Sequence, residues 1–182
     1  PPFWGFPIVI EQSQRPATTV DPLRHTARRL IRRGEIDAAE RLYREAVTQD
    51  PSPSAKLALG RFLVSVCRDK DAVMPLQEAA REARFHAESA TAARCLNLLA
   101  GIFHRAGRGA DAARCEQAAV RAELDSAGRL SAMTLVNRAT TAMGAGDLRQ
   151  AARLLVAARR TAAHDELPQV CLASGVLWLN CD

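Results

Sequence analysis

Apolar and small residues recur along most of the chain at spacings of three and four, the pattern that amphipathic helices produce. The stretch GEIDAAERLYREAVTQDPS, residues 34–52, shows it most clearly, because Ala39, Tyr43 and Ala46 fall on one helical face and Pro51 closes the segment. The pattern predicts helices over residues 22–33, 36–49, 54–67, 70–84, 88–106, 109–125, 128–143, 147–163 and 168–180.

The spacing around Ala39 returns three times further along the chain. The anchors of the four copies are 33, 40 and 39 residues apart: Ala39, Ala72, Ala112 and Ala151. A glycine stands five residues before three of them, at positions 34, 107 and 146. Such a period predicts tandem helix hairpins. The anchor alanine would lie where the two helices of a hairpin cross, and the glycine would end the first helix in a left-handed conformation.

The first two units resemble the tetratricopeptide repeat. The matching residues are Gly34, Ala39, Tyr43, Ala46 and Pro51 in the first unit, and Leu59 and Gly60 in the second. The third unit, LNLLAGIFHRAGRGADAARCEQAA, is similar to the longer repeats of kinesin light chain, with Asn97 at one of their Asn positions. The resemblance covers roughly residues 20–163 and implies an all-α fold, a right-handed α-solenoid of antiparallel helix hairpins.

Four tetratricopeptide-like units are expected within residues 20–167, at about 20–52, 53–86, 87–127 and 128–166. Residues 168–182 then form a C-terminal helix, which is either a cap or the start of a fifth unit. Residues 1–19 do not fit the repeat and predict an extended linker or the remnant of a preceding domain. Because the chain has no initiator Met, we expect it to be a piece of a longer protein.

Two residues depart from the repeat pattern in the second half of the chain. Glu116 replaces the large apolar residue expected four positions after Ala112, and Arg138 stands where a leucine is expected in the fourth unit. No unit has the early Trp of the repeat family. The sequence alone assigns no role to these departures.

The amino-acid composition indicates which side chains fill the core and which charge a partner would carry. The 182 residues are 48% hydrophobic but only 4% aromatic, so Leu, Ala and Val must fill the core, which suits closely packed helices. The net charge of +5 and pI of about 9.4 favour an acidic partner. A GC-rich genome is the alternative cause, since there are 23 Arg but only two Lys among many Ala residues.

The five cysteines, at 67, 95, 115, 171 and 181, form no CxxC pair and are odd in number. They argue against a disulfide framework and against a zinc site, and favour a reducing compartment. No apolar run reaches the roughly 18–20 residues of a membrane span, and the start PPFWGFPIVIEQ lacks the basic region of a signal peptide. We therefore expect a cytoplasmic protein.

No constellation of residues predicts catalysis. The four histidines, at 25, 86, 104 and 164, lie in four different units and form no metal-binding motif. The chain has no GxSxG elbow and no glycine-rich phosphate loop, and GRGAD at 107–111 is a turn between helices. We expect no enzyme activity, no cofactor and no metal.

The resemblance implies that the first helix of each unit lines a concave groove, and that a partner protein or peptide binds there. In this frame the candidate binding residues are Arg24, Arg28, Arg32, Arg61, Arg94, Asn97, His104, Arg105 and Asn137. Apolar positions such as Leu57, Val64 and Val136 would share the groove. Guanidinium groups grip carboxylates through paired hydrogen bonds, so an acidic segment is the expected ligand.

Several alternatives remain open at this stage. The arginines can pair with Glu35, Glu40 or Glu45 on neighbouring helices, Asn97 can bridge helices, and His104 can be a packing residue. The chain can also be a regulatory or oligomerisation segment of a larger transcription factor or enzyme, with self-association through the apolar C-terminal helix or the N-terminal FWGFPIVI. RNA binding is less favoured, because stacking aromatics are few.

Overall fold

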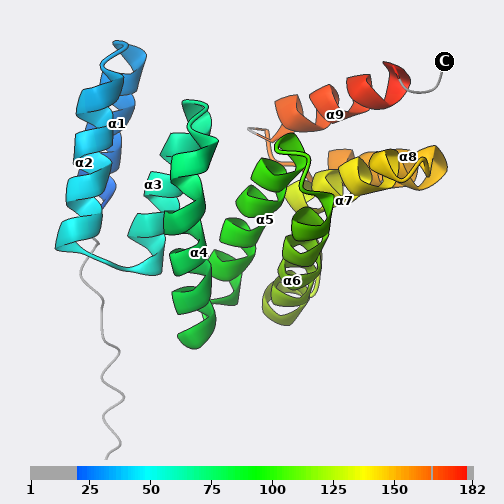
Figure 1. Cartoon of the computed structure of the whole chain (residues 1–182), viewed down its shortest axis with the longest axis horizontal. Helices are drawn as coiled ribbons and strands as arrows, with labels where there is room; N and C mark the ends of the chain where they lie inside the picture. Colours follow the sequence, from blue (N-terminus) through cyan, green and yellow to red (C-terminus); the bar gives the residue numbers. More distant parts are fainter. Residues whose placement is uncertain (1–19, 165, 180–182) are drawn as a thin grey trace, which may run out of the picture.

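The computed structural model describes residues 20–164 and 166–179, and this part of the chain folds entirely into helices and short turns (Figure 1). The helices are α1 (Val20–Arg32), α2 (Ile36–Gln49), α3 (Pro53–Ser65), α4 (Asp69–Phe85), α5 (Ser89–Arg105), α6 (Gly109–Ala127), α7 (Ala132–Gly144), α8 (Leu148–Thr161) and α9 (Leu167–Leu179). Each predicted helix is present. The prediction of a linker over residues 1–19 and the last residues of the C-terminal helix lie outside the described part.

Consecutive helices pack as hairpins, α1 with α2, α3 with α4, α5 with α6, and α7 with α8. The first helices α3, α5 and α7 also contact one another, and α9 packs on both α7 and α8. Figure 1 shows the result, in which α1 and α2 occupy one end, α8 and α9 the other, and the helix direction turns from upright to horizontal along the chain. This arrangement is the predicted all-α solenoid.

Five tight turns between helices share one backbone geometry. In each turn a residue with a left-handed backbone is followed by a residue whose N–H bonds to a carbonyl five positions earlier, with N–O distances of 2.7–3.0 Å. The left-handed residues are Gly34, Cys67, Ala87, Gly107 and Gly146. Glycine marked three of these turns in the sequence, as predicted. Cys67 and Ala87 adopt the same conformation, at φ of +60° and +57°, without that signal.

The anchor alanines lie at the helix crossings, as the repeat pattern predicted. Ala39, Ala72, Ala112 and Ala151 are all fully buried. Gly60 marks a close approach of α3 to α4, because a Cβ added there would lie 2.5 Å from the Leu76 side chain of α4. Small residues therefore set the distance between paired helices.

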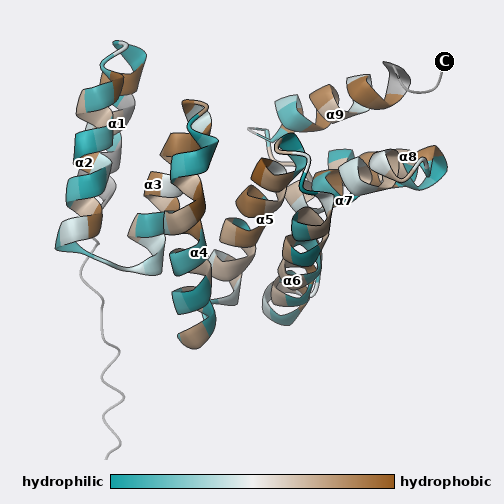
Figure 2. Cartoon of the chain, in the orientation of Figure 1, coloured by the Kyte–Doolittle hydropathy of each residue, from teal (hydrophilic) through white to brown (hydrophobic). Residues whose placement is uncertain are grey.

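The predicted start of the seventh helix at 128 is four residues too early. Gly128 ends α6 in a left-handed conformation at φ +63°, and the Ser131 hydroxyl accepts a hydrogen bond from Thr134 N to cap α7. The apolar core divides at the same place. One cluster of buried apolar residues spans α1 to α6, whereas separate smaller clusters join α7, α8 and α9. Figure 2 shows α5 as largely hydrophobic beside the more hydrophilic α6.

Candidate functional site

Acidic residues are distributed unequally between the two helices of each of the first three hairpins. The first helices α3, α5 and α7 contain no Asp or Glu, and α1 has only Asp21. Most carboxylates lie instead on α2, α4 and α6 or in the turns. Helix α5 contacts both α3 and α7. The exposed surface that these three helices share has cationic and neutral side chains, and we call it the inner face. Sequence reasoning identified the arginines of this face but not the absence of carboxylates beside them.

Three of the predicted binding arginines are exposed and not engaged in an ion pair with another described residue. Arg32 lies in the last turn of α1, Arg61 on α3 and Arg94 on α5. Arg24 and Arg28 belong to α1, but their side chains lie outside what the structure describes. Arg61 and Arg94 stand on α3 and α5, two helices that contact each other.

Arg105, a further predicted binding residue, is held by a neighbouring helix. Its Nε and Nη2 each lie 2.8 Å from one oxygen of Asp69, at the start of α4. This paired contact raises the pKa of Arg105 above its ordinary value. The guanidinium therefore ties α5 to α4 of the preceding hairpin.

Asn97 and Asn137 do not lie in an open groove, which corrects their assignment. Both are buried, at 4% and 5% exposure. Asn97 Nδ2 donates to Glu123 Oε1 at 3.1 Å and to Thr134 Oγ1 at 2.8 Å, and Asn137 Nδ2 donates to the Asn97 carbonyl at 3.0 Å. These side chains bridge α5, α6 and α7, which is the alternative noted for Asn97.

Glu123 and Ser131 complete this buried polar network, and neither was found from the sequence. Glu123 accepts hydrogen bonds from Ser131 N at 2.7 Å and from Ser131 Oγ at 2.6 Å. Glu123 therefore fixes the loop between α6 and α7. Its signal in the sequence was weak, because a glutamate near a helix end is ordinarily solvated.

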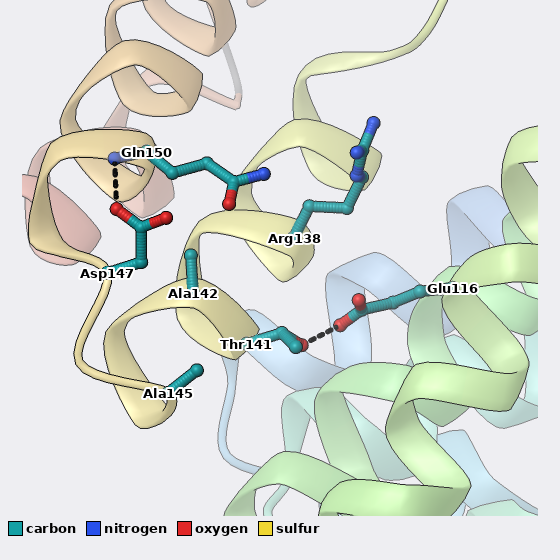
Figure 3. A pocket seen from close by; sticks show the side chains of 7 residues that line it. All are labelled: Glu116, Arg138, Thr141, Ala142, Ala145, Asp147 and Gln150. Atoms are coloured by element: carbon teal, nitrogen blue, oxygen red, sulfur yellow. Dashed lines mark hydrogen bonds between the residues drawn. The ribbon is translucent and has the colours of Figure 1, made fainter.

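His104 also packs inside the solenoid and does not face an open groove. Its Nε2 lies 2.6 Å from Glu116 Oε1, and the same oxygen accepts a hydrogen bond from Thr141 Oγ1 at 2.7 Å (Figure 3). The side chains of His104 and Glu116 are only 15% and 7% exposed. The glutamate that broke the repeat pattern thus joins α5, α6 and α7.

The two departures from the repeat pattern line one pocket. Glu116 of α6 and Arg138 of α7 border a pocket of about 300 Å³ that Asp147 and Gln150 close at the start of α8 (Figure 3). Asp147 Oδ1 accepts from Gln150 N at 2.9 Å and so caps α8. Glu116 and Arg138 each replace an apolar residue of the repeat pattern, and both line this pocket. The third and fourth hairpins therefore meet there through polar side chains.

Neither a metal centre nor a membrane helix was found in the described part of the chain. No group of three or more His, Cys, Asp or Glu residues among the described residues is placed to hold a metal ion. None of the described helices is long and apolar enough to cross a membrane. The described cysteines are free thiols.

Paired helices, recurring buried alanines and a shared turn geometry give the described part of the chain the fold of an all-α solenoid built from helix hairpins. Its structure is similar to the crystal structure of BtubC (BKLC) from P. vanneervenii, with a TM-score of 0.71 and 19% identity over 89% of this chain and 72% of that one. A tetratricopeptide repeat protein from Parabacteroides merdae also matches, with a TM-score of 0.44 and 15% identity over 88% of this chain and 70% of that one. No protein-family model and no curated protein matches the sequence.

Proposed function

We propose that the protein is a non-catalytic scaffold whose inner face binds an extended, acidic segment of another protein. The observation that carries this proposal is the absence of any carboxylate from α3, α5 and α7, together with the exposed and unpaired Arg61 and Arg94. A carboxylate of the partner can form paired hydrogen bonds with either guanidinium. The Asp69 carboxylate, which reaches α5 from the start of α4, is already paired with Arg105.

The backbone of α5 leaves room for such a segment. Gly101 lies on the same helical face as Arg94 and Arg105, because seven and four residues correspond to about two turns and one turn. A Cβ added at Gly101 would meet only Arg105 Nη1 at 3.6 Å and Asn137 Oδ1 at 4.0 Å. A partner chain can therefore approach the helix closely between the two arginines.

The same face is poorly suited to single-stranded RNA. RNA-binding surfaces place aromatic rings where bases can stack. The aromatic residues of α3 and α5 are Phe62 and Phe103, which are only 3% and 5% exposed, and α7 has none. A protein ligand is therefore favoured over a nucleic acid. The free thiols suit a partner in a reducing compartment such as the cytoplasm.

Binding to immobilised peptides of defined composition tests the proposal. The probes are twelve-residue peptides rich in Asp and Glu, with sets in which Gln or Lys replaces the acidic residues. We expect the acidic set alone to bind, and the double variant Arg61→Glu/Arg94→Glu to bind it at least tenfold more weakly with unchanged circular dichroism. The control Arg153→Glu/Arg160→Glu changes two exposed arginines of α8 and should bind normally. Equal binding by both double variants would overturn the proposal.

A further inference from the structure

A second groove lies on the other side of α5. It has a volume of about 560 Å³ and runs between α4 and α6, with α5 as its floor. Leu96 and Leu99 of α5 line it, and at 100° per residue they lie roughly opposite Arg94 and Gly101 on the helix. The groove is therefore separate from the inner face. We call it the outer groove.

The outer groove combines an apolar floor with an exposed aromatic ring. Leu96 and Leu99 are 8% and 2% exposed, and Cys115 of α6 stands across from α4. Phe85, the last residue of α4, borders the groove with 86% of its surface exposed. Covering this exposed ring with a ligand would be favourable, because burying apolar surface contributes about 25 cal/mol of free energy per Å².

The α4 wall of the groove is cationic. Arg81 and Arg84 are exposed and form no ion pair among the described residues. The glutamates of α4 turn elsewhere, since Glu82 Oε1 lies 2.7 Å from Lys56 Nζ on α3 and Glu78 lies 3.5 Å from it. No carboxylate of the described residues lines the groove. Its charge therefore complements an acidic ligand.

We propose that the outer groove binds a short acidic and apolar segment of a partner protein. An apolar side chain of the segment packs on Leu96 and Leu99 against Phe85, and flanking carboxylates pair with Arg81 and Arg84. This groove is distinct from the inner face, so the scaffold can hold two protein segments on opposite sides of α5.

Fluorescence anisotropy with labelled twelve-residue peptides tests the proposal. The probe carries two Leu or Phe residues flanked by Glu and Asp, and in a matched peptide Lys replaces each acid. We expect Arg81→Glu/Arg84→Glu and Phe85→Ser each to weaken binding of the acidic probe at least tenfold. Met74→Ser is the control, since Met74 is an exposed apolar residue of α4, at 61%, that does not line the groove.

A thiol footprint locates the bound peptide independently of the variants. Saturating probe should slow alkylation of Cys115 at least fivefold and leave the exposed Cys67 unchanged, as read by mass spectrometry of proteolytic fragments. Arg61→Glu/Arg94→Glu on the inner face should not alter this protection. Three results would each overturn the proposal: loss of binding in the inner-face variant alone, an unprotected Cys115, or no binding of the acidic probe. Each result tests the outer groove independently of the binding proposed for the inner face.

Discussion

The carboxylate of Glu116 lies 2.6 Å from His104 Nε2, so the side chain that replaces an apolar residue of the repeat bonds to the helix preceding its own. Thr141 of the next hairpin donates to the same oxygen at 2.7 Å. One buried carboxylate thus holds three helices at the point where the apolar core divides. The third and fourth hairpins therefore contact each other through polar side chains at this junction.

Removing this carboxylate should weaken the fold. Glu116→Ala removes the charged acceptor that His104 and Thr141 share and leaves only their mutual 3.3 Å contact, and losing a hydrogen bond to a charged group costs about 1–3 kcal/mol. We expect the free energy of unfolding, measured with urea, to fall by about 2 kcal/mol. Glu45→Ala on α2, where the carboxylate is exposed, should change it by less than about 0.5 kcal/mol. Equal losses in the two variants would contradict the role of Glu116.

Two helical glycines should respond oppositely to alanine. Gly60→Ala forces a Cβ to within 2.5 Å of Leu76, so we expect a destabilisation of about 1–3 kcal/mol from overpacking. Gly101→Ala has room, and the higher helix propensity of Ala should add up to about 1 kcal/mol. Thermal and urea unfolding measure the stability of the two variants against the unchanged protein. A Gly60→Ala protein of unchanged stability would refute the close approach of α3 to α4.

Cys67 occupies a backbone conformation that favours glycine. At φ +60° it stands five residues before Ala72, where the other repeats have Gly34, Gly107 and Gly146. Because left-handed geometry costs a non-glycine residue about 1–2 kcal/mol, we expect Cys67→Gly to stabilise the protein by up to about 1 kcal/mol. The reciprocal Gly107→Ala should destabilise it. Urea midpoints that move in the opposite directions would show that this turn does not share the common geometry.

Ala112 should tolerate no larger side chain. It is fully buried at the crossing of α5 and α6, so Ala112→Leu should destabilise the protein by about 1–3 kcal/mol or more. Ala110 lies two residues earlier, on the exposed side of α6, and Ala110→Leu is the matched control. We expect only the first variant to lower the thermal midpoint, and a normal midpoint for Ala112→Leu would place the crossing elsewhere.

Alkaline pH should weaken the fold through Cys95. Burial raises the pKa of its thiol from 9.0 to about 12 in the folded chain. Between these two values the unfolded chain binds fewer protons, so the stabilising contribution is complete below pH 9 and is lost as pH rises toward 12. Urea unfolding at pH 8 and 10.5 should show a smaller decline for Cys95→Ala than for the unchanged protein. An identical decline would exclude this thiol as a cause.

Local periodicity was sufficient to predict the helices and the crossing alanines. Helix period depends on neighbours three and four residues apart, and a crossing alanine is marked by its fixed distance from the glycine turn. The turns at Cys67 and Ala87 lacked that mark, because tertiary packing there imposes a conformation that local preference disfavours. The helix ends at Gly128 and Ser131 were likewise set by a cap that involves Glu123, eight residues before Ser131.

The binding residues were less predictable than the fold. Arg61 and Arg94 followed from helix register alone and are exposed as expected. Asn97 and His104 share that register, yet both turn toward α6 and α7, where partners 26 and 12 residues away satisfy them. Hydrogen bonds over such separations leave no periodic trace in a single sequence.

The sequence by itself determined a chain of helix hairpins, their approximate limits and the small residues at their crossings, since each depends on contacts within about one helical turn or one repeat. Only the tertiary structure decided which polar side chains are buried and which arginines remain free. Burial of a charged group requires a partner at bonding distance, and His104 and Asn97, the partners of Glu116 and Glu123, lie on a different helix that folding brings close.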